Sequence, residues 1–236
     1  MDCLALKPIA TVNSPYKEKF AIPRQPGLVA EAVGEIVFND ALDAENMIKG
    51  IEQYSHLWVI FAFHGTMAQG WKPLVKAPRL GGNKKIGVLA TRSTFRPNPI
   101  GMSVVQLKEV SNDKGRVTLH IGAHDLLDKT PIIDIKPYIP YADSISQADG
   151  GIAQEAPELV DVVFSEQATK QLSAFKNRHR NLAAFIEQVL AQDPRPAYKK
   201  AKTDDKVYGM QLFDLNIMWS MKSLTTIQVM QVEEVK

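Results

Sequence analysis

Short apolar runs separated by glycine, proline and asparagine dominate the first 141 residues of the chain. Runs of this kind predict β-strands at residues 9–12, 35–38, 57–63, 86–90, 103–110, 117–121 and 132–135. Many short strands with frequent turn residues are typical of a closed or sandwiched β architecture, and we expect a β-barrel. The run 57–63 is apolar at both alternating positions, so it is expected to be buried on both faces. One helix is predicted at about residues 44–51, with Asp43 as its N-cap.

The pattern changes after residue 141. Residues 142–158 carry few large apolar side chains and predict a linker. Beyond it, Ser165 is a candidate cap for a first helix, and Asn181 for a second. The second helix would carry one apolar face, made of Leu182, Phe185, Ile186, Val189 and Leu190, and end at Asp193-Pro194. Alternation from Val207 onward predicts two or three antiparallel strands. We therefore expect a barrel domain at 1–141, a linker at 142–158 and a small α+β domain at 159–236.

Composition narrows the class of protein. A hydrophobic fraction of 45% supports a full core, and a net charge of +2 permits a nucleic-acid partner only where basic residues cluster. The single cysteine, Cys3, excludes a disulfide framework and a cysteine-rich zinc site, and it fits a reduced, cytoplasmic compartment. The N-terminus has no signal-peptide core, and the longest apolar run, 57–63, is much shorter than the roughly 18 residues of a membrane span. We expect neither a membrane nor a metal as partner.

Residues 90–101 read A-T-R-S-T-F-R-P-N-P-I-G and contain little that packs a core. Two prolines flank Asn98 and restrict its backbone, and they weaken any strand at this point. Arg92 and Arg96 offer forked donors suited to carboxylates or phosphates. The stretch indicates a stiff platform that presents polar groups to a ligand, although a plain connecting loop is the alternative.

Other polar stretches have a functional and a structural interpretation. The segment P-R-Q-P-G at 23–27 is either a binding loop or an exposed mobile loop. His64 and Gly65 follow the apolar run 57–63, where a site residue is common, but a lone histidine is often a hydrogen-bonded structural residue. Trp71 and the basic residues that follow it could stack bases and bind phosphates, or form a solvated loop.

The last two polar stretches lie further along the chain. Asp125 and Asp128 are either site residues or ordinary turn residues. Asp134 and Lys136 share one face of a predicted strand, as a site or as an ion pair. The segment D-P-R-P-A-Y at 193–198, followed by lysines, is either a nucleic-acid contact or a helix stop with a charged loop. Motifs of P-loop, Rossmann, zinc-protease and serine-hydrolase sites are absent from the sequence.

The stretch A-T-R-S-T-F-R-P-N-P-I-G-M-S closely resembles the signature of the TsaA-like, or TrmO, family. Further segments resemble the family in the same order: S-P-Y-K-E-K-F with P-R-Q-P-G, H-L-W-V-I-F-A-F-H, P-R-L-G-G-N, D-I-K-P-Y and L-A-Q-D-P-R-P-A-Y. The resemblance covers about residues 7–210 and is similar to the bacterial two-domain form. It implies a non-Rossmann β-barrel methyltransferase that uses S-adenosylmethionine. It also implies a homodimer with the cofactor site near the subunit contact.

The reaction implied by the resemblance is N6-methylation of N6-threonylcarbamoyladenosine at position 37 of tRNA. Cofactor-binding residues carried over on this basis are Gln25, Pro26, Gly27, Leu28, His64, Gly65, Arg92, Met102, His124, Asp125 and Leu126. Candidate proton acceptors are Asn98 and Asp134. Candidate substrate-binding residues are Arg96, Lys136, Tyr138, Arg195 and Tyr198. Arg96, Lys136 or Arg195 could pair with the threonyl carboxylate, and Tyr198 could stack on tRNA.

Two other functions remain open from the sequence. The barrel could be a non-catalytic RNA-binding module, since basic loops alone would serve that purpose. It could also methylate a small molecule with the same cofactor.

Overall fold

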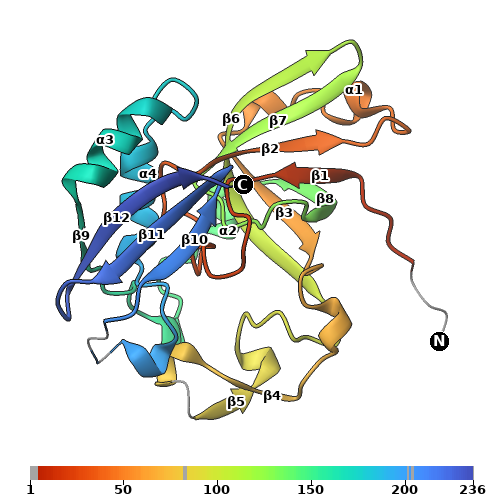
Figure 1. Cartoon of the computed structure of the whole chain (residues 1–236). Helices are drawn as coiled ribbons and strands as arrows, with labels where there is room; N and C mark the ends of the chain where they lie inside the picture. The colour runs from red at the N-terminus through yellow and green to blue at the C-terminus, as the bar shows by residue number, and fades with distance from the viewer. Residues whose placement is uncertain (1–4, 82–83, 201, 203–204, 236) are drawn as a thin grey trace.

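The computed structural model describes residues 5–81, 84–200, 202 and 205–235. The first part of the chain forms a closed six-stranded barrel with the neighbour order β1-β2-β7-β6-β3-β8, and β8 pairs back onto β1 (Figure 1). Its strands are β1 (Ala10–Asn13), β2 (Val33–Phe38), β3 (His56–Ala62), β6 (Ile100–Asp113), β7 (Arg116–Gly122) and β8 (Pro131–Pro137). All of the pairings are antiparallel. The prediction of a mainly β fold with a barrel is therefore confirmed.

An excursion between β3 and β6 leaves the barrel. It carries a two-stranded hairpin of β4 (Leu74–Lys76) and β5 (Lys85–Gly87), which lies well away from the barrel strands in Figure 1. The predicted strand at 86–90 is thus shorter than expected, because the chain turns into a 3-10 helix at Val88–Ala90. Further 3-10 turns lie at Ile51–Gln53, Met67–Gln69, Pro78–Leu80, Gly151–Ala153 and Ala197–Lys199.

Strand β3 differs from expectation in its burial. Leu57, Val59 and Phe61 point into the barrel and are buried, whereas Trp58 and Ile60 on the outer face are only half-buried. A barrel covers the inner face of each strand completely, but nothing in the described chain packs fully over the outer face here. The prediction of burial on both faces is wrong.

The second unit is a four-stranded sheet with two helices on one face. Its order is β10-β11-β12-β9, and β9 joins it in parallel while the other pairs are antiparallel. The strands are β9 (Asp161–Phe164), β10 (Tyr208–Leu212), β11 (Leu215–Met221) and β12 (Thr226–Glu234). Its two helices are α3 (Glu166–Phe175) and α4 (Leu182–Ala191). Two short helices, α1 (Ala44–Met47) and α2 (Pro140–Asp143), lie earlier in the chain. The sequence analysis predicted the two long helices and the antiparallel strands but did not predict β9.

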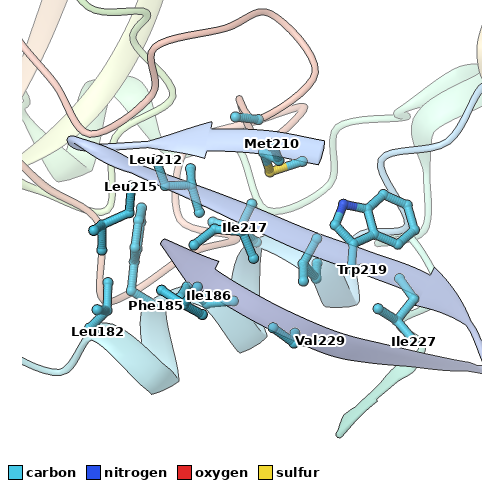
Figure 2. Close-up of a cluster of buried hydrophobic side chains, with 14 of the residues drawn as sticks. Leu182, Phe185, Ile186, Met210, Leu212, Leu215, Ile217, Trp219, Ile227 and Val229 are labelled. Atoms are coloured by element: carbon cyan, nitrogen blue, oxygen red, sulfur yellow. The ribbon is translucent and has the colours of Figure 1, made fainter. Parts of the chain in front are cut away.

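The apolar face of α4 packs onto this sheet. Leu182, Phe185 and Ile186 point toward the side chains of β10, β11 and β12 (Figure 2). All five residues predicted for that face are buried. The second core is separate from the barrel core, which contains residues such as Ile36, Leu119 and Ile132.

Of the three predicted helix N-caps, the structure confirms one. Ser165 caps α3, because its Oγ accepts a hydrogen bond of 3.0 Å from the Ala168 amide. Asn181 occupies the N-cap position of α4 without a side-chain cap bond, and its amide donates to Glu31 instead. Asp43 likewise makes no cap bond and accepts from the Asn46 side chain. Tertiary and local side-chain partners have replaced the expected caps at these two positions.

Residues 14–32, here called the bridging segment, connect the barrel to the second unit. The segment follows β1, yet its buried residues Tyr16, Ala21, Val29 and Ala32 belong to the core of the C-terminal sheet. Tyr16 forms an antiparallel bridge with Leu212. A long connection between two barrel strands is thereby held in place by the other unit.

Tyr16 allows a direct test of this packing. Its ring is fully buried, with an edge contact to His124 at 5.4 Å and a contact to Phe185 at 5.8 Å between ring centroids. Its hydroxyl has no hydrogen-bond partner in the described structure. Tyr16→Ala should lower the free energy of unfolding by about 3–5 kcal/mol, as for other large aromatic truncations. Tyr16→Phe should leave it unchanged or raise it, because a buried unpaired hydroxyl is removed. Urea denaturation of both variants measures the difference, and equal destabilisation by both would contradict the packing role.

Candidate active site

A pocket of about 510 Å³ opens where β3 and β6 leave the barrel. Its walls come from the bridging segment, the ends of β3 and β6, the segment 90–101 and the turn that holds Asp125. This volume lies in the range of small-molecule and cofactor sites. Four segments that are distant in the sequence therefore meet at one cavity.

The apolar back wall depends on close packing around one glycine. Phe61 and Phe63 meet edge to face with ring centroids 5.3 Å apart. A Cβ atom at Gly101 would lie 2.5 Å from the Phe61 ring and 2.8 Å from the Phe63 ring. The glycine at the end of the 90–101 segment is needed because both rings approach the backbone directly.

Side-chain hydrogen bonds to the backbone fix the segment 90–101. The Thr91 hydroxyl donates to the Val88 carbonyl at 2.8 Å and accepts from the Ser93 amide at 3.1 Å. Arg96 Nη1 donates to the Thr91 carbonyl at 2.7 Å. These bonds replace the strand ladder that the prolines prevent, and they hold an irregular backbone in one shape.

Among the described residues that line the pocket, Asp125 is the one with a carboxylate side chain. Burial raises the pKa of its carboxyl to about 6, although a hydrogen bond from Ser103 and the charge of Arg92 oppose the rise. Its Oδ1 atom is buried and has no partner in the described structure. A buried carboxylate oxygen without a partner is costly, and a ligand cation or donor would satisfy it.

The bridging segment reaches the pocket through fixed contacts at both ends. Asp128 Oδ1 accepts from the Ser14 amide at 2.8 Å, and its Oδ2 pairs with Lys17 at 2.8 Å. Further along, the Gly27 amide donates to the Ala123 carbonyl at 2.7 Å. These contacts place Gln25 over the pocket, where its side-chain oxygen accepts a hydrogen bond from Arg92.

The predicted cofactor-binding residues fall into two groups. Gln25, His64, Gly65, Arg92, Met102 and Asp125 line the pocket. Pro26, Gly27, Leu28, His124 and Leu126 are their chain neighbours and do not line it. His124 is fully buried behind the pocket, and burial lowers the pKa of its imidazole to about 4 against an opposing backbone bond to Val33. It is therefore a neutral packing residue that also accepts from the Leu126 amide at 3.3 Å.

Most of the other candidates lie elsewhere. Of the predicted substrate residues, Arg96 lines the pocket. Asn98 is exposed outside it, and Asp134 on β8 pairs with Lys136 at 3.6 Å, as the alternative of an ion pair proposed. Tyr138 contacts the ring of Trp58 at 5.9 Å on the outer side of the barrel. Tyr198 is exposed on the loop after α4.

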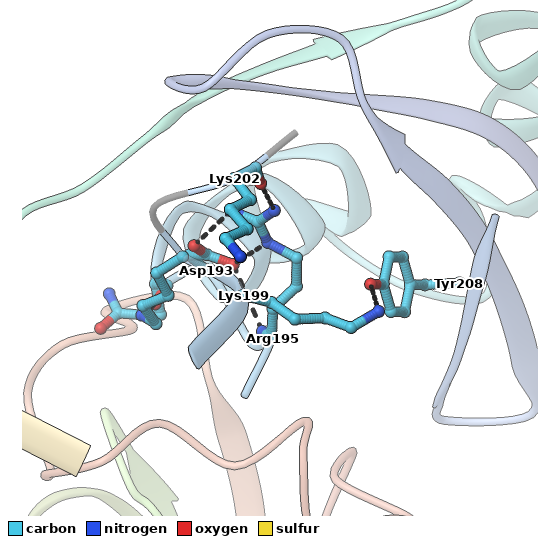
Figure 3. A network of polar contacts seen from close by, with 7 residues as sticks. Asp193, Arg195, Lys199, Lys202 and Tyr208 are labelled. Atoms are coloured by element: carbon cyan, nitrogen blue, oxygen red, sulfur yellow. Dashed lines mark hydrogen bonds and ion pairs between the residues drawn. The ribbon is translucent and has the colours of Figure 1, made fainter. Parts of the chain in front are cut away.

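Arg195 requires a correction. It is 1% exposed, and its Nε and Nη2 atoms bind the two carboxylate oxygens of Asp193 at 2.8 and 2.9 Å (Figure 3). Its Nη1 atom donates to the Lys202 carbonyl at 2.8 Å. The guanidinium thus holds the loop after α4 together and does not face a substrate. The sequence shows the arginine and the acid but not that they pair in the interior.

The pocket also contains residues that the sequence analysis did not assign. Arg24 was seen only as part of a polar loop, and Ser103 and Thr66 were not considered. Ser103 could have been found from the sequence, because it is a polar residue at a position of β6 that faces inward and is buried. The sequence around Arg24 gives no such indication, since the position of Arg24 depends on the path of the bridging segment.

The described residues contain no group of three or more histidine, cysteine, aspartate or glutamate side chains placed to hold a metal ion. No helix in the part of the chain that the structure describes has the length and apolar character to cross a membrane.

Comparison with known proteins identifies the family. The family model of the tRNA-methyltransferase O N-terminal domain matches residues 11–144. The family model of the TrmO C-terminal domain matches residues 157–235. The chain belongs to the tRNA-methyltransferase O family and carries both of its domains.

The individual relatives agree with this assignment. The chain is 50% identical over 220 residues to the tRNA (adenine(37)-N6)-methyltransferase of Escherichia coli K12, which covers 93% of this chain and 94% of that protein. It is 44% identical over 229 residues to a putative S-adenosylmethionine-dependent methyltransferase, RcsF, of Pseudomonas aeruginosa, with 97% of each chain covered. The crystal structure of TrmO from Pseudomonas aeruginosa matches with a TM-score of 0.82 at 38% identity, covering 98% of each chain.

The environment of Asp125 predicts a pH-dependent stability. Its pKa is higher in the folded protein than in the unfolded chain, so the fold favours the protonated form. The associated stabilisation is present below about pH 4 and is lost as the pH rises through about 6. Asp125→Asn should therefore raise the free energy of unfolding by about 3 kcal/mol at pH 8, and by much less at pH 4.

Urea denaturation without cofactor at several pH values measures this effect. Asp134→Asn serves as the control, because Asp134 lies in a half-exposed ion pair outside the pocket. A difference between Asp125→Asn and the parent protein that does not change with pH would contradict the interpretation.

Proposed function

We propose that this protein is an S-adenosylmethionine-dependent methyltransferase that methylates N6 of N6-threonylcarbamoyladenosine at position 37 of tRNA. The observation that carries the proposal is the pocket on the barrel, in which the arginine–proline segment meets the Asp125 carboxylate, one oxygen of which is buried without a partner in the described structure. Membership of the tRNA-methyltransferase O family and 50% identity to a tRNA (adenine(37)-N6)-methyltransferase support the reaction type.

The residues of the pocket fit S-adenosylmethionine. The cofactor carries a carboxylate, an ammonium and a sulfonium, so it needs both an anion and a cation from the protein. Asp125 offers an unpaired buried oxygen to the cationic groups. Arg92, held by Gln25, offers a forked donor to the carboxylate. Phe61 and Phe63 supply an apolar wall beside them.

Methyl transfer would depend on positioning by this chain. Bound S-adenosylmethionine supplies an activated methyl group, and the attacking N6 must lie in line with it. The segment 90–101 and the bridging segment fix the walls that set this alignment. Asn98 and Asp134 lie outside the pocket, so we assign neither of them the role of accepting the N6 proton.

Exposed aromatic and apolar residues support two partners, tRNA and a second copy of the chain. Tyr198 is 68% exposed in the segment after α4, which supports a role in stacking on an RNA base. Leu89, Ile100 and Met102 are exposed apolar residues, and Ile100 and Met102 also line the pocket. They support a homodimer contact close to the cofactor site. A substrate of tRNA supports a cytoplasmic location.

The test of the function is methylation of defined tRNA. The protein with S-adenosylmethionine should convert tRNA carrying threonylcarbamoyladenosine to a product with a methylated modified base, detected by mass spectrometry of nucleosides. Arg92→Ala should lower kcat/KM by about 10- to 100-fold, because a charge-assisted contact is lost. Arg116→Ala, an exposed residue at the start of β7, is the matched control.

Two outcomes would contradict the proposal. Failure of the protein to bind S-adenosylmethionine by isothermal titration would favour a non-catalytic RNA-binding module. Binding of the cofactor without methylation of this tRNA would favour a small-molecule substrate.

A further inference from the structure

Arg24 differs from the other basic residues of the pocket. Among the described residues, four lysine and arginine side chains line it: Lys19, Arg24, Arg92 and Arg96. Lys19 lies 5.3 Å from the centre of the Phe95 ring. Arg92 donates to Gln25, and Arg96 donates to the Thr91 carbonyl. Within the described residues, the guanidinium of Arg24 has no hydrogen bond or ion pair, so its donors are available to a ligand.

The surroundings of Arg24 carry an excess of positive charge. Burial and the Arg79 cation lower the pKa of Arg24, while Asp193 opposes this. Burial also lowers the pKa of Lys200, with Asp193 opposing and the charges of Arg24 and Arg195 adding to the decrease. Both oxygens of Asp193 are bound by Arg195, as Figure 3 shows. The Asp193 carboxylate, whose charge acts on Arg24 and Lys200, is therefore already paired with Arg195.

The cluster of Arg24, Arg79 and Lys200 lies where the two units meet. Lys200 Nζ donates to the Gln192 carbonyl at 3.2 Å, and the Gln192 side chain donates to the Leu28 carbonyl at 3.4 Å. Arg79, from the excursion between β3 and β6, donates to the Glu155 carbonyl at 2.6 Å. Arg24 is the member of the cluster that also lines the pocket. The pocket thus has a buried acid, Asp125, and a separate cationic side at this junction.

We propose that Arg24, supported by the charges of Arg79 and Lys200, binds the threonyl carboxylate of the modified base and so selects the carbamoylated substrate. This inference rests on the function proposed above. The carboxylate lies a few bonds from N6, so it must enter the same pocket as the reacting nitrogen. A forked guanidinium without another partner matches a carboxylate in two parallel hydrogen bonds.

A second carboxylate, that of the cofactor, could also pair with Arg24. Arg92 is the cation whose charge acts on Asp125, so Arg92 and Asp125 form a pair suited to the zwitterionic end of S-adenosylmethionine. Arg24 is coupled to Arg79, Asp193 and Lys200 instead, on the side that joins the second unit. This separation of the two cations assigns the substrate carboxylate to Arg24.

A double-mutant cycle tests the assignment in the full-length protein. Two tRNAs are compared, one with the natural threonyl carboxylate and one in which that carboxylate is converted to an amide. For the parent protein, amidation should lower kcat/KM by about 10- to 100-fold, since a charged hydrogen-bonded contact is lost. Arg24→Gln should show a similar loss with the natural tRNA and no further loss with the amidated tRNA. Arg24→Lys should recover part of the activity with the natural tRNA.

The controls separate the possible failures. Arg116→Gln should show the same sensitivity to amidation as the parent protein, and thermal unfolding should confirm that Arg24→Gln is folded. Equal sensitivity of Arg24→Gln and the parent protein to amidation would overturn the inference. A weaker affinity of Arg24→Gln for S-adenosylmethionine, measured by isothermal titration, would overturn it by assigning Arg24 to the cofactor. A parent protein that methylates neither tRNA would refute the proposed function itself, and the inference would fall with it.

Discussion

The pocket depends on how the bridging segment is held between two hydrophobic cores. Asp128 binds the start of this segment to the barrel through the Ser14 amide and Lys17. Tyr16, which lies between these two residues in the chain, is fully buried in the core of the C-terminal unit. The segment therefore cannot shift without breaking a charge-assisted contact on one side or opening a cavity on the other. Gln25 and Arg24 reach the pocket because of this double attachment.

The opposite wall achieves its rigidity by other means. The segment 90–101 has no strand ladder, and hydrogen bonds from Thr91 and Arg96 to nearby carbonyls hold it. Two stiff segments thus line one cavity, in which Asp125 lies beside Arg92 and Arg24 lies toward the second unit. Because methyl transfer is governed largely by alignment, such fixed walls are suited to the reaction. We propose that Arg92 and Asp125 serve the cofactor and that Arg24 serves the substrate.

The sequence predicted elements well where a repeating pattern decided the structure. The apolar face of α4 and the barrel strands follow directly from periodicity, because side-chain spacing sets which positions are buried. It failed where tertiary contacts decided the outcome. The outer face of β3 is apolar but only half-buried, and Asn181 donates to Glu31 instead of capping α4. Neither burial by a distant segment nor a partner far along the chain leaves a local signal.

In the candidate site, too, local motifs predicted some residues, and tertiary contacts decided the position of others. Arg92, Gln25 and His64 reached the predicted site through a resemblance between short motifs, and the structure brings them to one pocket. Arg195 was placed incorrectly, because a proline-rich basic loop gives no indication that its arginine pairs inward with Asp193. Arg24 was overlooked for the converse reason. Its position at the pocket is set by the packing of Tyr16 and the contacts of Asp128, which are properties of the whole fold.

The most direct test of this account is the affinity of Asp128→Ala for S-adenosylmethionine, measured by isothermal titration. Asp40→Ala, an exposed turn residue, is the control. Loss of the two contacts that Asp128 makes to the bridging segment should weaken binding by at least about 10-fold, while Asp40→Ala should bind like the parent protein. A folded Asp128→Ala protein with unchanged affinity would show that the pocket does not depend on the bridging segment.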